Sequence, residues 1–180
     1  MRALADAARV RRFLRELGTK SREEIRVYLT GGATAVLYGW RPTTADVDIK
    51  IIPDSDAVLQ LIPELKESVQ INVELAAPDQ FIPELPGWQE RSPFVAREGK
   101  ASVHHYDLYA QALAKIERGH ARDLGDVEAM LASGLIDREE LLRHFAKIEP
   151  ELYRFPTIDP PSFQRRVEAI ARRTPARPEG

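Results

Sequence analysis

The stretch that decides the fold is Tyr28–Ile52, YLTGGATAVLYGWRPTTADVDIKII. A short apolar run leads into the glycine pair Gly31 and Gly32, and a second apolar run carries Asp46 and Asp48 one residue apart. Side chains of successive strand residues point to opposite faces, so the two aspartates share one face and their apolar neighbours share the other. The pattern predicts a strand, a glycine turn, a short helix and a second strand that bears two carboxylates.

These residue types together indicate a site for a metal-bound phosphate. Two carboxylates held this close repel each other unless a divalent cation lies between them. A glycine turn lets the backbone approach a ligand, and the N-terminus of the following helix offers N–H groups to an anion. Arg41, Thr43 and Thr44 lie at the entrance to the carboxylate strand. Taken singly, the glycine pair could be only a tight turn, and the two aspartates could be the solvated face of a strand that continues to Lys50. The combination of these features favours a functional site.

Composition excludes several classes of protein. The 180 residues fit one domain, or a small core with an appended helical subdomain, and 43% hydrophobic with 30% charged residues is typical of a globular protein. The net charge of −2 provides no global field toward nucleic acid. The absence of cysteine excludes disulfides, thiolate nucleophiles and zinc–sulfur sites. The N-terminus lacks the apolar run of a signal peptide and no segment could span a bilayer, so we expect a cytoplasmic location without membrane contact.

Periodicity predicts a mixed first half and a helical second half. We expect a helix at 3–17 ended by Gly18, strands at 25–30, 47–52 and 71–76, helices at 33–38 and 56–67 with an interruption at Pro63, an irregular segment at 78–92, and a hairpin of 94–97 and 102–106. Helices follow at 108–118, 122–132 and 138–148, with a last one through Phe163, Val167 and Ile170. The predicted fold class is α/β (α+β), with a small mixed sheet in 1–106, a helical subdomain in 107–173 and a frayed tail in 174–180.

The order Gly31-Gly32, Thr34, Arg41, Thr44, Asp46-x-Asp48, then an acidic residue on a later strand, resembles the nucleotidyltransferase superfamily that shares the DNA polymerase β palm. Two segments, GGATAVLYGWRPTTADVDI and QALAKIERGHARDLGDVEAML, resemble the AbiEii-like and DUF6036-type nucleotidyltransferases, some of which are toxins of toxin–antitoxin pairs. The resemblance runs from about Tyr28 through the helices beyond Asp126.

The resemblance implies roles for these residues. Asp46, Asp48 and Glu74 would be catalytic and hold two Mg²⁺ ions, with Asp79 the alternative to Glu74 as third carboxylate. The nucleotide would be bound by Gly31, Gly32, Thr34, Arg41, Thr44, Lys115, Arg122, Asp123 and Asp126. Many members carry Ser or Thr directly after the second glycine, whereas this chain has Ala33 followed by Thr34.

Other side chains favour structural interpretations. Arg122 and Asp126 share a helix face, so they can form an ordinary ion pair. The adjacent residues His104 and His105 face opposite sides of a strand and cannot easily ligate one metal together. Aromatic residues such as Trp40, Trp88 and Phe94 could stack a base, but they are more typical of packing and receive no role.

The expected function is Mg²⁺-dependent transfer of a nucleoside monophosphate from an NTP to an acceptor hydroxyl. The acceptor would be an RNA, chiefly a tRNA 3′ end, or a protein side chain, and a cognate antitoxin would be a partner if the chain is a toxin. The alternative is a catalytically inactive palm that binds nucleotide, RNA or a partner. An aspartate-based phosphatase or a glycosyltransferase ranks last, because the glycine pair has no role in either scheme and Lys50 departs from the usual phosphatase pattern.

Overall fold

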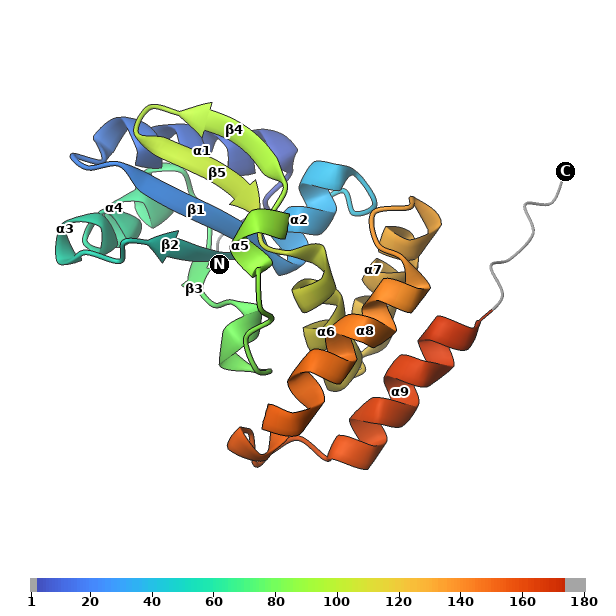
Figure 1. Ribbon diagram of the computed structural model, residues 1–180. Coiled ribbons are helices and arrows are strands. Elements are labelled where there is room, and N and C mark those ends of the chain that lie inside the picture. Colours follow the sequence, from blue (N-terminus) through green and yellow to red (C-terminus); the bar gives the residue numbers. More distant parts are fainter. Residues whose placement is uncertain (1–2, 174–180) are drawn as a thin grey trace, which may run out of the picture. The chain divides into compact units, whose positions relative to one another are not determined.

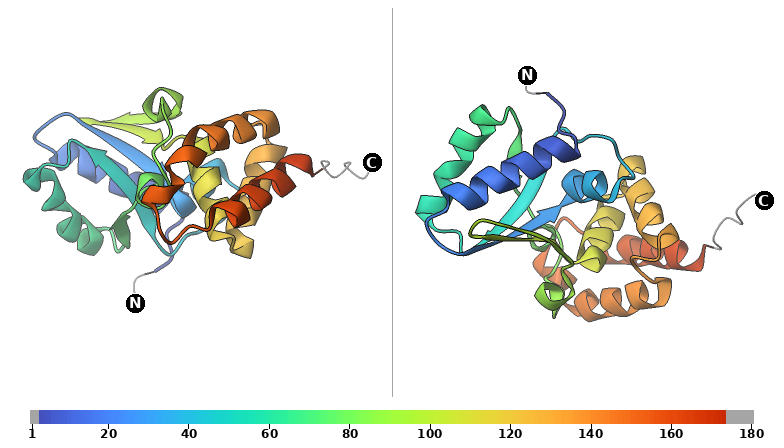
Figure 2. Two further views of the ribbon diagram at one scale, coloured as in Figure 1. Left: turned by 60° about the horizontal axis from the view of Figure 1, so that its bottom comes forward. Right: turned by 90° about the horizontal axis from the view of Figure 1, so that it is seen from above.

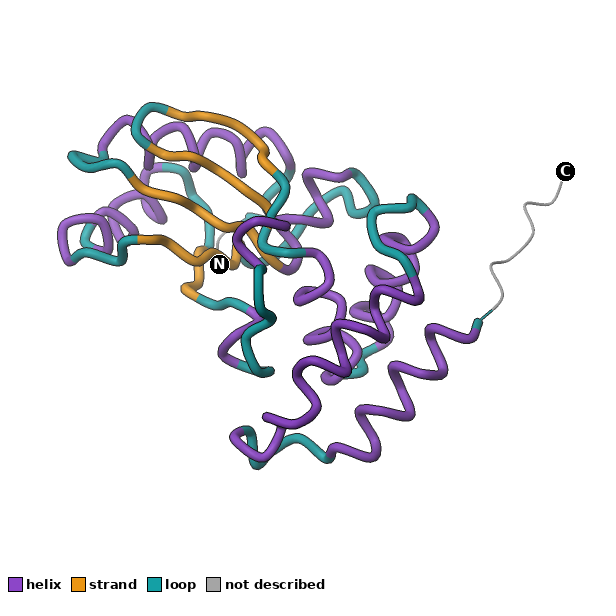
Figure 3. The backbone as a smooth tube through the Cα atoms, in the orientation of Figure 1, coloured by secondary structure: helices purple, strands orange, loops and turns teal. Residues whose placement is uncertain are grey.

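The computed structural model describes residues 3–173, which form two compact units. The first comprises the chain up to Ala77 together with Gln89–Asp107, and the second comprises Pro78–Trp88 and the chain from Leu108 onward. All strands belong to the first unit, whereas the second is built from helices and turns (Figure 3). The predicted fold class, a mixed sheet with covering helices followed by a helical region, is confirmed.

The first unit holds a five-stranded mixed sheet in the order β3-β2-β1-β5-β4 (Figure 1). Its elements are α1 (Ala7–Lys20), β1 (Ile25–Thr30), α2 (Gly31–Tyr38), β2 (Val47–Ile52), α3 (Asp56–Leu59), α4 (Leu61–Ser68), β3 (Val73–Leu75), β4 (Phe94–Glu98) and β5 (Ala101–His105). β1 pairs antiparallel with β2 and parallel with β5, β2 pairs parallel with β3, and β4 pairs antiparallel with β5. The short helix α5 (Trp88–Arg91) precedes β4.

One face of this sheet is covered by α1 and α4, which lie behind the strands in Figure 1. In the view from above, α1 crosses in front of β2 (Figure 2, right). α1 presents an apolar stripe to this face because its buried residues recur at helical spacing. The covered face and its helices form the core: Val10, Phe13, Leu14, Leu17, Val27, Leu29, Val47, Ile49, Ile62, Leu65 and Val103.

The opposite side of the sheet, here called the polar face, carries the alternate residues. On β2 these are Asp48 and Lys50, whose register partners on β1 are Thr30 and Tyr28. Tyr28 is in turn aligned with His104 of β5. Directly opposite residues of paired strands lie on the same face, so the carboxylate strand and β5 contribute to one surface.

Most predicted elements of the first unit agree with the structure, but several bounds differ. The strand predicted at 71–76 is shortened to β3 (Val73–Leu75), and the helix predicted at 33–38 begins at Gly31, so that the glycine pair forms its first turn. The prediction that Gly18 ends the first helix is wrong, because α1 continues to Lys20. A methyl group on Gly18 would lie 1.7 Å from the carbonyl oxygen of Glu98, so this glycine permits close packing of the helix on the β4–β5 hairpin. The helix predicted at 56–67 is interrupted at Gln60 rather than Pro63, which fits within the first turn of α4.

The second unit contains α6 (Leu108–Arg118), α7 (Ala121–Ala132), α8 (Arg138–Ile148) and α9 (Pro160–Arg172), with 3₁₀ turns at Pro78–Gln80 and Glu149–Arg154. Asp137 caps α8 by accepting bonds from two backbone N–H groups of its first turn. Phe145 and Phe163 pack edge to face at 4.9 Å between α8 and α9. The tail predicted at 174–180 lies outside the described residues.

Candidate active site

The turn from β1 into α2 brings a carboxylate against a helix N-terminus. Gly31 has φ +60°, and a methyl group on it would lie 2.7 Å from Oδ2 of Asp48. Asp48 reaches this position because it is the register partner of Thr30, the last residue of β1. The positive end of the helix dipole favours negative charge here. Gly31 is therefore required both for its backbone conformation and for the approach of the acid.

The second glycine makes room for a hydroxyl. A methyl group on Gly32 would lie 2.0 Å from Oγ1 of Thr44, which donates a hydrogen bond to the carbonyl oxygen of Asp46 at 2.9 Å. The loop between α2 and β2 is also fixed by a two-bond bridge, because Thr44 and Ala5 exchange backbone hydrogen bonds of 2.8 and 2.9 Å. The glycine pair thus positions both Asp48 and the residue that leads into Asp46.

The three predicted carboxylates come from neighbouring segments of the first unit. Asp48 of β2 is the register partner of Glu74 of β3, and both occupy alternate positions relative to buried Val47 and Val73. Asp46 directly precedes β2 and accepts a hydrogen bond from the side-chain amide of Asn72. Asp46 and Asp48 are half-buried, whereas Glu74 is exposed at the sheet edge. The structure therefore brings Asp48 and Glu74 side by side and ties Asp46 to an amide neighbour.

This set of donors suits magnesium in one specific way. Among residues 3–173, no group of three or more His, Cys, Asp or Glu side chains is arranged to hold a metal ion. Mg²⁺ prefers oxygen ligands and is usually bound through one or two carboxylates together with water and substrate phosphates. Asp46 and Asp48 supply carboxylate oxygens of this kind beside the glycine turn, so the residues fit an ion that arrives with a triphosphate.

Two predicted nucleotide contacts have different surroundings. Thr34 is wholly buried, and its hydroxyl donates to the carbonyl oxygen of Leu29 at 3.2 Å and lies 3.0 Å from Nδ1 of His105. Burial, and to a lesser degree the positive charge of Arg11, lowers the pKa of His105 to about 4. Arg41 is half-buried in the loop after α2. Thr34 thus joins α2 to the end of β5, and a role of Thr34 or Arg41 toward a nucleotide stays a prediction.

The predicted residues of the second unit form a buried ionic cluster. Nζ of Lys115 on α6 lies 2.7 Å from Asp126 and 3.5 Å from Asp123 on α7, and all three side chains are buried. Arg118 binds both oxygens of Asp123, at 2.7 and 2.8 Å. Burial alone would raise the pKa of Asp123, but the hydrogen bonds and positive charges of Arg118 and Lys115 hold it below its usual value.

In this cluster Asp126 is bound by Lys115, and Arg122 is exposed on α7. The ion pair between Arg122 and Asp126 stays a prediction. The cluster ties α6 to α7, and a role of its members toward a nucleotide stays a prediction.

Sequence reasoning missed two polar partners. Asn72 holds Asp46, and the signal for it is its position two residues before Glu74 on the same side of the β3 segment. His105 was expected to be structural, but its bond to Thr34 was not foreseen, because nothing in the sequence aligns α2 with the last residue of β5.

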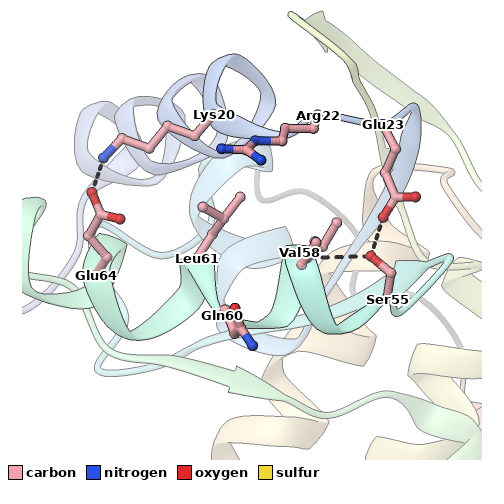
Figure 4. Close-up of a pocket in the computed structure, with 9 residues that line it drawn as sticks. Lys20, Arg22, Glu23, Ser55, Val58, Gln60, Leu61 and Glu64 are labelled. Atoms are coloured by element: carbon pink, nitrogen blue, oxygen red, sulfur yellow. Dashed lines mark hydrogen bonds and ion pairs between the residues drawn. The ribbon is translucent and has the colours of Figure 1, made fainter.

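A surface pocket of 560 Å³ lies elsewhere in the first unit (Figure 4). It is bordered by the Lys20–Glu64 ion pair and by the hydrogen bond from Ser55 to Glu23, with Val58 and Leu61 on its apolar side. These residues lie where β1 begins and β2 ends, whereas Gly31 and Asp48 lie at the other ends of those strands. Five residue steps along a strand correspond to about 17 Å. The pocket is therefore separate from the candidate active site.

A family model described as a nucleotidyltransferase of unknown function, DUF6036, matches residues 7–156. The chain belongs to this family. The DUF6036 match includes the glycine turn, all three carboxylates and the Lys115 cluster, and it supports nucleotidyl transfer as the general activity. Comparison with curated proteins and with solved structures gives no match. In the described part of this DUF6036 chain, no helix has the length and apolarity needed to cross a membrane.

Proposed function

We propose that the chain is a Mg²⁺-dependent nucleotidyltransferase that moves a nucleoside monophosphate from an NTP to an acceptor hydroxyl. The observation that carries the proposal is the contact of the Asp48 carboxylate with Gly31 at the start of α2, with Glu74 aligned beside it on β3. The DUF6036 description supports the same general activity. The first turn of α2 offers N–H groups to an anion next to acidic side chains that can hold its counter-cation.

In this proposal each residue has a defined task. Asp46 and Asp48 would hold two Mg²⁺ ions, which when bound supply positive charge to the phosphate oxygens of the reacting NTP. Asn72 orients Asp46, and Thr44 fixes the backbone that precedes β2. Glu74, exposed next to Asp48, accepts the proton of the attacking hydroxyl. The hydroxyl oxygen forms a bond to the α-phosphorus as the bond to pyrophosphate breaks.

The test uses the full chain with each α-labelled NTP, Mg²⁺, total RNA and total protein. We expect label transfer from at least one NTP, loss of transfer on removal of Mg²⁺ with a chelator, and transfer reduced to background in Asp46→Asn and Asp48→Asn. Asp54→Asn, an exposed acid beyond the end of β2, is the matched control and should retain activity. Full activity of Asp48→Asn with an unchanged melting temperature would refute the assigned role.

A palm that binds nucleotide or RNA without turnover is the second candidate. The placement of the acids favours it, because among residues 3–173 no three His, Cys, Asp or Glu side chains are arranged to hold a metal ion. The two candidates separate in one experiment, since a binding module would show NTP affinity in the wild type but no transfer with any of the four nucleotides.

A toxin role and an antitoxin partner rest on the family resemblance. If the chain is a toxin, its expression should arrest growth, and the Asp48→Asn variant should not. Equal growth of cells that express either protein would exclude the toxin role.

A further inference from the structure

We propose that the polar face of the sheet binds a single-stranded nucleic acid, whose end is the acceptor of the transferred nucleotide. This inference rests on the proposed function for the identity of the acceptor, but the binding itself does not depend on catalysis. The surface is defined by Arg26, Lys50, His104 and Phe94, which lie on β1, β2, β5 and β4 of the first unit. Figure 1 is viewed toward this face of the sheet.

The strand register places these side chains on the same face as the carboxylate Asp48. Lys50 follows Asp48 by two residues on β2, and its partner Tyr28 is aligned with His104. Phe94 is the partner of His104 across β4 and β5. Phe94 lies three strand spacings across the sheet from Asp48, about 14 Å, and two residues along the strands from it, about 7 Å. A nucleic acid strand whose end reaches the acids can therefore lie over the rings of Phe94 and His104, here called the aromatic pair.

The aromatic pair forms a fixed stacking surface. Phe94 is 63% exposed, and its ring meets the ring of His104 edge to face at 5.6 Å. His104 is held at both ring nitrogens, by Ser102 at 2.9 Å and by the carbonyl oxygen of Ser92 at 3.4 Å, and it stacks on buried Tyr28 at 5.5 Å. A ring that is already ordered loses little conformational entropy when a base stacks on it. Base stacking on aromatic side chains tolerates any sequence and is typical of single-strand binding.

Charge complementarity points to a polyanion. Arg26 is exposed at the start of β1 and Lys50 is half-buried on β2, both on the polar face. Arg97, the β4 residue aligned with Ser102, adds a further cation there, although it forms an ion pair with Glu24. Asp48 is aligned with Thr30 at one end of this surface, whereas Arg26 and Arg97 are aligned with Ser102 toward its other end, four residues along the strands. Cations that track a backbone beside rings that stack bases are the combination found in single-strand grooves.

The test measures binding of labelled 12-nucleotide single strands to the full chain, without NTP or metal, as RNA and as DNA of the same sequence. We expect binding that weakens with salt, and a loss of about tenfold in affinity for Phe94→Ala. Arg26→Gln and Lys50→Gln should each lower the slope of log affinity against log salt by about 0.7. The RNA and DNA arms identify which backbone is preferred.

Matched controls lie in the second unit. Tyr153→Ala removes a ring that is 79% exposed, and Lys147→Gln removes an exposed cation, so neither variant should change the affinity or the slope. No binding of either strand by the wild type at low salt, or equal affinities for wild type, Phe94→Ala and Arg26→Gln, would overturn the inference. Transfer to a protein acceptor without nucleic acid binding would overturn it while leaving the proposed function intact. Binding without any transfer would refute the proposed function and the acceptor role of the strand, and would leave only the binding surface.

Discussion

The contact between Gly32 and Thr44 provides a test of how the glycine turn is built. A methyl group on Gly32 would lie 2.0 Å from Oγ1 and 2.7 Å from Cβ of Thr44, closer than real side-chain atoms approach. Gly32→Ala should therefore force Thr44 and its loop to move. Overpacking of this kind destabilises proteins by about 1–3 kcal/mol. The alanine also has a better helix propensity than glycine, which offsets up to about 1 kcal/mol.

Removal of the Thr44 side chain should reverse the sign of the change in unfolding free energy caused by Gly32→Ala. In a Thr44→Gly background both clashing atoms are absent, so Gly32→Ala should raise the free energy of unfolding by up to about 1 kcal/mol. The coupling energy between the two substitutions is then about 1–3 kcal/mol. Thr44→Gly alone loses the hydrogen bond to Asp46 and adds backbone freedom, and the double-mutant cycle subtracts both effects.

Urea unfolding of the four proteins, followed by fluorescence and far-UV circular dichroism, measures this coupling. Label transfer should fall in Gly32→Ala, because the hydroxyl of Thr44 donates a hydrogen bond to the carbonyl oxygen of Asp46. If the two substitutions add within about 0.5 kcal/mol, the close approach of Thr44 to Gly32 is not what requires the glycine, and the reasoning is wrong.

Three further outcomes follow from buried or aligned charges. Lys115→Met leaves the Asp126 carboxylate buried without its closest cation, so urea unfolding should show a loss of about 3–5 kcal/mol, most of which returns in the double variant with Asp126→Leu. The pKa of His105 is lowered from its ordinary 6.5 to about 4, so the unfolded chain binds the proton more readily. The stability contributed by the neutral ring is complete above pH 6.5, and about 3 kcal/mol of it is lost as the pH falls toward 4. His105→Gln should flatten this part of the plot of unfolding free energy against pH. Glu74→Gln removes a like charge opposite Asp48, so without Mg²⁺ it should stabilise the protein slightly, by up to about 1 kcal/mol; a melting temperature that falls would contradict that alignment.

Sequence periodicity was sufficient for the elements whose residues are selected by burial alone. The strands at 25–30 and 47–52 and the helix at 138–148 were predicted with the bounds that the structure has. In each of them, the apolar residues recur with the period of the element and cover one side. Gly18 shows the limit of such rules, because its neighbour in space is Glu98, eighty residues away in sequence, and no local pattern reports that contact.

The candidate site was predictable where one strand carries its residues and less so where several segments meet. The position of Asp48 followed from a single strand, whereas Asp46 lies just before β2 rather than on it. The register adds Glu74 as the neighbour of Asp48. Thr34 was assigned to the nucleotide because it follows the glycines, yet the helix that starts at Gly31 turns it inward toward His105. The direction of a side chain in the first turn of a helix depends on how that helix packs on the sheet. The sequence alone does not report the packing of α2.

The pairing of β2 with β3 bears on the choice between an enzyme and a binding module. Across these two strands an acid faces an amide at Asp46 and Asn72, and the next aligned pair, Asp48 and Glu74, places two acids opposite each other. Without a bound cation the pair of Asp48 and Glu74 costs stability, since like charges aligned on neighbouring strands are destabilising. A neutral partner such as Asn72 shows that the same edge can hold an acid without repulsion. The like-charge pair beside the glycine turn therefore favours a site that uses a divalent cation over a degenerate palm.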